Sequence, residues 1–95
     1  MALIQVTPDE LRAKATQVRN YKTQHDDVIT QLRTLVNGLN DSWKGEAQTA
    51  FVNNFESMRS TFTDFSNMLE DYAKRMDTAA NQLEQTDSSL ASSFR

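Results

Sequence analysis

The sequence predicts an all-α fold, an antiparallel two-helix hairpin that dimerises into a four-helix bundle. Apolar residues recur at heptad spacing on both sides of one break, at residues 41–45. The chain of 95 residues has only two glycines and one proline, too few turn formers for a fold of many short strands. This length fits one domain, residues 1–95, whose hydrophobic fraction of 38% supplies a core only if the apolar residues share one stripe.

The first helix is expected over residues 8–40. Thr7 is positioned to accept hydrogen bonds from the first helical turn, Pro8 suits the first helical position, and Glu10 completes a capping box. Apolar residues then recur at spacings of three, four and seven residues, which is the pattern of a helix that packs against more than one neighbour. The predicted core stripe of this helix consists of Leu11, Val18, Val28, Leu32, Leu35 and Leu39.

A turn at residues 41–45 separates the two helices. We expect Gly45 to permit a tight backbone there, and the ring of Trp43 to close the open end of the hairpin. The second helix is expected to run without interruption over residues 46–90, because neither glycine nor proline follows Gly45. Eleven of the twelve positions in its two heptad rows are apolar, where the composition predicts about five. The predicted stripe here consists of Phe51, Phe55, Met58, Phe62, Phe65, Leu69, Tyr72 and Met76.

Two helices lying side by side leave much of each apolar stripe in water, so we expect a second chain to cover it. A homodimer with two-fold symmetry is the simplest arrangement, and a heterodimer with a similar chain is the alternative. A fold centred on residue 43 pairs residue i with about residue 86 − i, so residues beyond about 78 extend past the first helix. This overhang contains the tail, residues 83–95, whose apolar side chains need a partner chain or a receptor.

The composition argues against catalysis and against several classes of ligand. With no cysteine and a single histidine, we expect no metal site, no cofactor, no small-molecule substrate and no enzymatic activity. A net charge of −3 argues against nucleic acid as a partner. His25 lies in the apolar row of the first helix, where it either packs at the interface or acts as a pH switch. The N-terminal residues lack the basic segment of a cleavable signal peptide, and no stretch approaches a membrane span.

The Trp-x-Gly motif of Trp43 and Gly45 lies in the central turn between two heptad helices of a chain close to a hundred residues long. With these features the chain resembles the WXG-hundred family, the small helical-hairpin proteins related to the early secretory antigenic target. The resemblance covers the whole chain. It implies a hairpin that dimerises into a four-helix bundle. It also implies export by a type VII secretion system of a Gram-positive or mycobacterial bacterium, without a cleaved signal peptide.

The family's C-terminal export pattern is hydrophobic-x-x-x-acidic-x-x-hydrophobic-x-x-x-hydrophobic. The residues that match this pattern here are Leu83, Asp87, Leu90 and Phe94. At helical spacing they share one face, which suits a helix-in-groove contact. The resemblance implies that the receptor is a membrane-anchored FtsK-type ATPase. Many members have tyrosine where this chain has Leu83, and the leucine form looks more like homodimeric members from the Firmicutes.

The sequence therefore predicts a small secreted, non-enzymatic protein that leaves the cytoplasm as a folded dimer. Two alternatives remain open at this point. The first is a co-exported partner or targeting chaperone for a larger toxin, and the second is an intracellular coiled-coil adaptor whose tail packs on its partner chain. The role after export is also open, because virulence, membrane disruption and service to the secretion machine all fit the same pattern.

Overall fold

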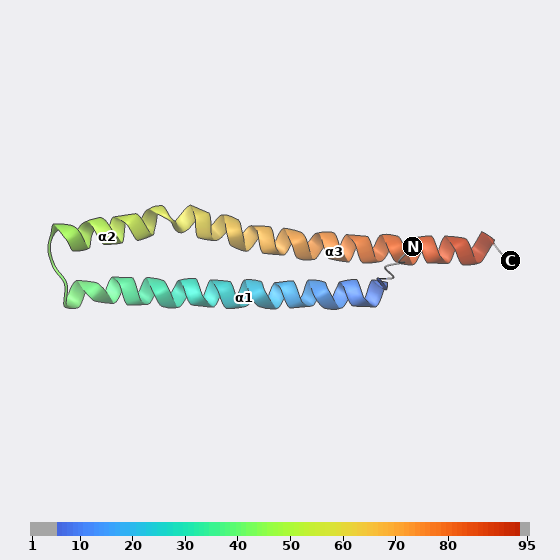
Figure 1. The fold of residues 1–95 in the computed structure, drawn as a ribbon, viewed down its shortest axis with the longest axis horizontal. Coiled ribbons are helices and arrows are strands. Elements are labelled where there is room, and N and C mark those ends of the chain that lie inside the picture. The colour runs from blue at the N-terminus through green and yellow to red at the C-terminus, as the bar shows by residue number, and fades with distance from the viewer. Residues whose placement is uncertain (1–5, 94–95) are drawn as a thin grey trace, which may run out of the picture.

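The predicted all-α hairpin is confirmed. The structure is a computed structural model that describes the backbone of residues 6–93 and the side chains of residues 6–86. Helix α1 spans Pro8–Gly38, and the short 3-10 helix η1, Leu39–Asp41, follows it directly. The second arm consists of α2, Glu46–Ser57, and α3, Arg59–Ser93. Figure 1 shows α1 antiparallel to this second arm, in an elongated molecule of 76 × 25 × 17 Å.

The start of α1 follows the predicted capping box. Thr7 has an extended backbone, and its side-chain hydroxyl accepts a hydrogen bond from the Glu10 amide at 3.1 Å. The Thr7 carbonyl accepts from the Leu11 amide, also at 3.1 Å. Pro8 occupies the first helical position, where its missing N–H leaves no bond unmade. These contacts satisfy amides that would otherwise lack partners at the helix start.

The second arm is not continuous, in contrast to the uninterrupted helix predicted over residues 46–90. The α-helical ladder stops at Met58, whose amide bonds to the Phe55 carbonyl at 3.0 Å, a tighter i to i − 3 contact. Just before it, the Ser57 hydroxyl donates to the Asn54 carbonyl at 2.6 Å. Serine side chains compete with the backbone ladder in this way without any glycine or proline. Figure 1 shows the bend between α2 and α3.

The register of the two arms also differs from the prediction. Arg12 bonds to Asn81 and Glu84, whereas a fold centred on residue 43 would have placed it opposite about residue 74. The point of folding lies later because η1 and residues 42–45 cross between the arms before α2 begins. The overhang is consequently shorter than predicted. Glu84, which follows Leu83, contacts Arg12 and therefore lies at the level of the first turns of α1. Figure 1 shows α3 continuing past the start of α1.

The buried seam between the two arms is narrow and made mainly of small side chains. Its residues are Ala15, Val36, Gln48, Ser66, Ala73 and Ala80. On α3 these small residues recur every seven positions, which keeps them on one side of the helix and lets α1 approach closely. Large apolar side chains therefore contribute little to the fully buried core of the single chain, and Val36 is the largest side chain with less than 2% exposure.

Candidate functional site

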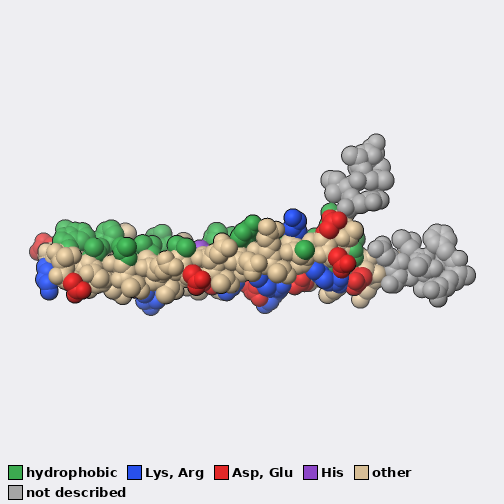
Figure 2. Space-filling model, turned by 90° about the horizontal axis from the view of Figure 1, so that it is seen from below, with side chains coloured by type: hydrophobic (Ala, Val, Ile, Leu, Met, Phe, Trp, Pro, Cys, Tyr) green, Lys and Arg blue, Asp and Glu red, His purple; other side chains and the backbone are tan. Residues whose placement is uncertain are grey.

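A face of large apolar side chains remains exposed along both arms. We call it the open face, and its residues are Tyr21, Val28, Leu32, Leu35, Phe51, Met58, Phe65, Met68 and Tyr72. Val28 is 58% exposed and Leu35 is 63% exposed on α1, while Phe65 and Tyr72 on α3 are 46% and 48% exposed. Figure 2 shows apolar side chains gathered along one edge of the molecule, with charged groups on the remaining surface. Such a surface marks a contact with another molecule.

The predicted apolar stripe is thus divided into two rows with different surroundings. Half of its members are half-buried beside the seam, namely Leu11, Val18, Leu39, Phe55, Phe62, Leu69 and Met76. The other half is exposed on the open face, namely Val28, Leu32, Leu35, Phe51, Met58, Phe65 and Tyr72. None of them belongs to the fully buried seam. Sequence reasoning missed Ser66, Ala73 and Ala80, although their spacing of seven would have revealed the row.

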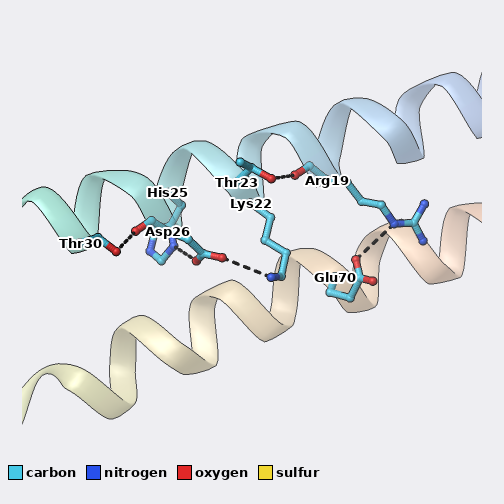
Figure 3. Close-up of polar contacts among 7 residues, drawn as sticks. All are labelled: Arg19, Lys22, Thr23, His25, Asp26, Thr30 and Glu70. Atoms are coloured by element: carbon cyan, nitrogen blue, oxygen red, sulfur yellow. Dashed lines mark hydrogen bonds and ion pairs between the residues drawn. The ribbon is translucent and has the colours of Figure 1, made fainter.

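Ion pairs between the arms hold the far end of the hairpin in register. Arg12 contacts Glu84 at 2.7 Å. Arg19 contacts Asp77 at 2.9 Å and Glu70 at 3.3 Å, the second of which is drawn in Figure 3. The hydrogen bond from Arg12 lowers the pKa of the Glu84 carboxyl below its usual value. The arginines Arg12 and Arg19 lie seven residues apart on α1, and so do their partners Glu84 and Asp77 on α3.

His25 is packed and hydrogen-bonded, which is the simpler of its two predicted roles. Its ring lies 4.9 Å from the ring of Phe65, and Nδ1 is 3.2 Å from the Asp26 carboxylate. Lys22 contacts the other oxygen of Asp26 at 3.2 Å, as Figure 3 shows. A hydrogen bond with Ser66 is the largest of the effects that lower the pKa of Asp26. The pH-switch hypothesis for His25 stays a prediction.

The turn places Trp43 and Gly45 at one end of the hairpin. Gly45 has φ 127° and ψ −179°, a conformation that essentially only glycine adopts. Its carbonyl accepts a hydrogen bond from the Thr49 amide at 3.1 Å. The Trp43 amide donates to the Leu39 carbonyl at 2.7 Å. The Trp43 ring lies 5.8 Å from the Phe51 ring and remains 37% exposed. Trp43 therefore joins the open face at its turn end, and the hairpin end is only partly closed by its ring.

Only part of the predicted export signal lies among the described residues. Leu83 is 36% exposed on α3, so its side chain is accessible beside the Arg12–Glu84 pair. The structure describes the backbone of Asp87 and Leu90 as part of α3, but it does not describe their side chains. Phe94 lies outside the described residues altogether. The described part of the tail thus presents one accessible apolar residue of the motif.

The described residues contain neither a cluster of metal ligands nor a membrane-spanning helix. Among residues 6–86, no group of three or more histidine, cysteine, aspartate or glutamate side chains is arranged to hold a metal ion. None of the helices in the described part of the chain is both long enough and apolar enough to cross a membrane. The functional features that remain are the open face, the Trp-x-Gly turn and the tail.

Comparisons with known proteins point in the same direction. The family model WXG100, described as proteins of 100 residues with WXG, matches residues 3–88. The protein YukE of Bacillus subtilis is 35% identical over 96 residues, which cover 98% of this chain and 96% of YukE. A type VII secretion system extracellular protein A of Staphylococcus aureus is 23% identical, covering 99% of this chain and 97% of that protein.

Two solved structures share the hairpin. EsxA of Geobacillus thermodenitrificans superimposes with a TM-score of 0.81 at 26% identity, covering 96% of this chain and 98% of that one. The secreted protein EsxB of Bacillus anthracis gives a TM-score of 0.79 at 26% identity, covering 92% of this chain and 99% of that one. The helical hairpin is therefore shared over most of this chain.

Proposed function

Because the chain belongs to the WXG100 family, we propose that it is a small non-enzymatic protein exported as a folded homodimer by a type VII secretion system. The names of its relatives support export: one is an extracellular protein of such a system, and another is titled a secreted protein. The proposed location is extracellular, after synthesis in the cytoplasm.

The observation that carries the dimer is the open face. Its rows on α1 and on the second arm contain aromatic and aliphatic side chains that remain about half exposed, such as Val28 and Phe65. A second copy placed across this face would cover both rows and produce a four-helix bundle with a two-fold axis. The seam of small residues and the half-buried row beside it hold each hairpin together, so the exposed row is left for the partner.

The proposed receptor contact is the tail, residues 83–95, with an FtsK-type ATPase of the secretion machine. Leu83 supplies an accessible apolar side chain on α3. Asp87 follows it by four residues in the sequence, a spacing at which two residues of a helix share a face. An apolar patch with one acidic residue beside it suits recognition of a helix in a groove.

An export assay in the source bacterium tests this proposal. The culture supernatant is compared for the wild type, for the double variant Leu83→Ala with Asp87→Ala, and for a strain that lacks the FtsK-type ATPase. A cytoplasmic protein is followed in parallel to exclude lysis. We expect the protein in the medium only for the wild type in the intact strain. Retention of all three, or equal release of all three, would contradict export through this signal.

The partner's identity separates the main proposal from its closest alternative. A targeting chaperone for a larger toxin would use the same open face to pair with a different chain. Purification of the protein from its own bacterium, followed by mass spectrometry of the intact complex, distinguishes the two cases. We expect the mass of two identical chains, and a stoichiometric second protein would favour the chaperone.

A further inference from the structure

We propose that a cleft beside the Met58 break is a binding site for a carboxylate group. The cleft has a volume of about 220 Å³ and lies between α1 and the start of α3. The residues of its wall that matter here are Ile29, Arg33, Arg59, Phe62, Thr63 and Asn67. It is separate from the open face, the turn and the tail, so this inference does not rest on the proposed function.

The ion pairs between the arms show what the cleft lacks. Arg12 and Arg19 lie seven residues apart on α1, and their partners Glu84 and Asp77 lie seven residues apart on α3. The next step of seven reaches Asp26 on α1 and Glu70 on α3, and the step after that reaches Arg33 and Thr63, which both line the cleft. Arg12 and Arg19 thus have carboxylate partners on α3, whereas the residue of α3 at the level of Arg33 is a threonine.

Arg33 is left without a partner for its buried nitrogen. Its Nε atom is buried and makes no hydrogen bond within the described residues. No ion pair involves Arg33 in that part of the chain. A buried donor without an acceptor is costly, and a carboxylate is the acceptor that best fits a guanidinium. The Arg33 side chain also lines the cleft, so a carboxylate bound there would balance the charge of the guanidinium and would reach Nε once the side chain turns toward it.

The other charges of the cleft favour a single negative charge over a double one. Arg59 contacts Glu56 at 2.8 Å, so its charge is already balanced. Asp26 also lies in the wall, and it contacts Lys22 and His25, each at 3.2 Å. One unbalanced cation remains, so a monocarboxylate neutralises it, whereas a phosphate dianion would leave one negative charge in excess.

The apolar residues in the wall favour one kind of carboxylic acid, and the position of the cleft decides whether the acid can reach it in a dimer. Ile29 and Phe62 line the cleft beside Arg33, so an acid with a small apolar body makes more contact than acetate. At about 100° per residue, Arg33 lies about 160° around α1 from Leu35 of the open face. The cleft therefore stays accessible when a second chain covers the open face.

Nuclear magnetic resonance of the full chain tests the assignment. The probes are sodium benzoate for a free acid, N-acetyl-glutamate amide for an acidic side chain, and inorganic phosphate for a dianion. We expect benzoate to shift the Nε–H signal of Arg33 saturably. Arg33→Gln should weaken benzoate binding at least tenfold, whereas Arg75→Gln, which removes a 76% exposed arginine from the far part of α3, should leave it unchanged.

A second variant keeps the test decisive if Arg33→Gln unfolds. Thr63→Glu would supply the missing carboxylate from within the chain, so we expect a higher melting temperature and the loss of the benzoate shift. Binding of N-acetyl-glutamate amide as tightly as benzoate would support the site and identify an acidic protein side chain as its source. Tighter binding of phosphate, no saturable shift, or equal weakening by Arg75→Gln would overturn the proposal.

Discussion

Phe65 provides the sharpest test of the open face. It lies at the centre of the exposed row on α3 and is 46% exposed, so a partner chain has a large ring surface to cover there. A phenylalanine presents about 200 Å² of surface, which makes about 90 Å² available for burial in each chain. At about 25 cal/mol per Å², that burial contributes about 2 kcal/mol per chain and about 4 kcal/mol per symmetric dimer. Phe65→Ala should therefore raise the dissociation constant by about 1000-fold.

Sedimentation equilibrium across about three decades of protein concentration measures this change directly. Lys74→Ala is the matched control, because Lys74 is exposed on the same helix but about 160° away from Tyr72 of the open face. Because the Phe65 ring also contacts His25, circular dichroism must show that the variant keeps its helical content. The reasoning fails if Phe65→Ala dimerises as tightly as the wild type, or if the wild type is monomeric throughout the range.

Two further predictions concern the hairpin itself. Gly45→Ala should destabilise the chain by about 1–3 kcal/mol in urea unfolding, because φ 127° strains any side chain. Gly38→Ala is its control and should stabilise by about 0.5–1 kcal/mol, since Gly38 is helical with φ −66° and has open space around it. Acid should lower the melting temperature, because hydrogen bonds lower the pKa values of Asp26 and Glu84 in the folded chain from 3.8 and 4.5. In this pH range the unfolded chain binds more protons than the folded chain. The stability that these two carboxylates contribute is therefore fully present above their pKa values in the unfolded chain. It is lost as pH falls through their lower pKa values in the folded chain. Thermal melts between about pH 7 and about pH 3 measure it, and the double variant Asp26→Asn with Glu84→Gln should show a shallower decline.

The elements that local chemistry determines were predictable from the sequence. The start of α1 follows from the Thr7 cap and Pro8, because both act within one helical turn. The position of the turn follows from Gly45, because its backbone conformation excludes other residues. In each case the deciding contact lies within a few residues along the chain. The all-α class follows in the same way, from heptad spacing on both sides of that turn.

The features that depend on contacts between the arms were not predictable. The break at Met58 is accompanied by a bond from the Ser57 hydroxyl to the Asn54 carbonyl, but similar bonds of Thr16 and Thr23 occur in α1 without a break, so the residue types do not reveal it. The register is shifted because the crossing segment after α1 is longer than a tight turn. Ion pairs such as Arg12–Glu84 fix the register only once the helices lie side by side. The net charge of each arm does not reveal which residues form these pairs.

The apolar rows of each helix face different neighbours. This explains why the sequence analysis predicted a dimer but assigned the wrong residues to the buried core of the hairpin. Heptad spacing marks every apolar row as a candidate interface but does not say which row meets which neighbour. In α3 the row of Ser66, Ala73 and Ala80 meets α1, because small side chains let two helices approach closely. This seam and the half-buried row beside it bury apolar area within the single hairpin. The large side chains of the open face, including Phe65 and Tyr72, remain exposed. Their burial requires a second chain, so we expect the stability of the protein to depend on its concentration.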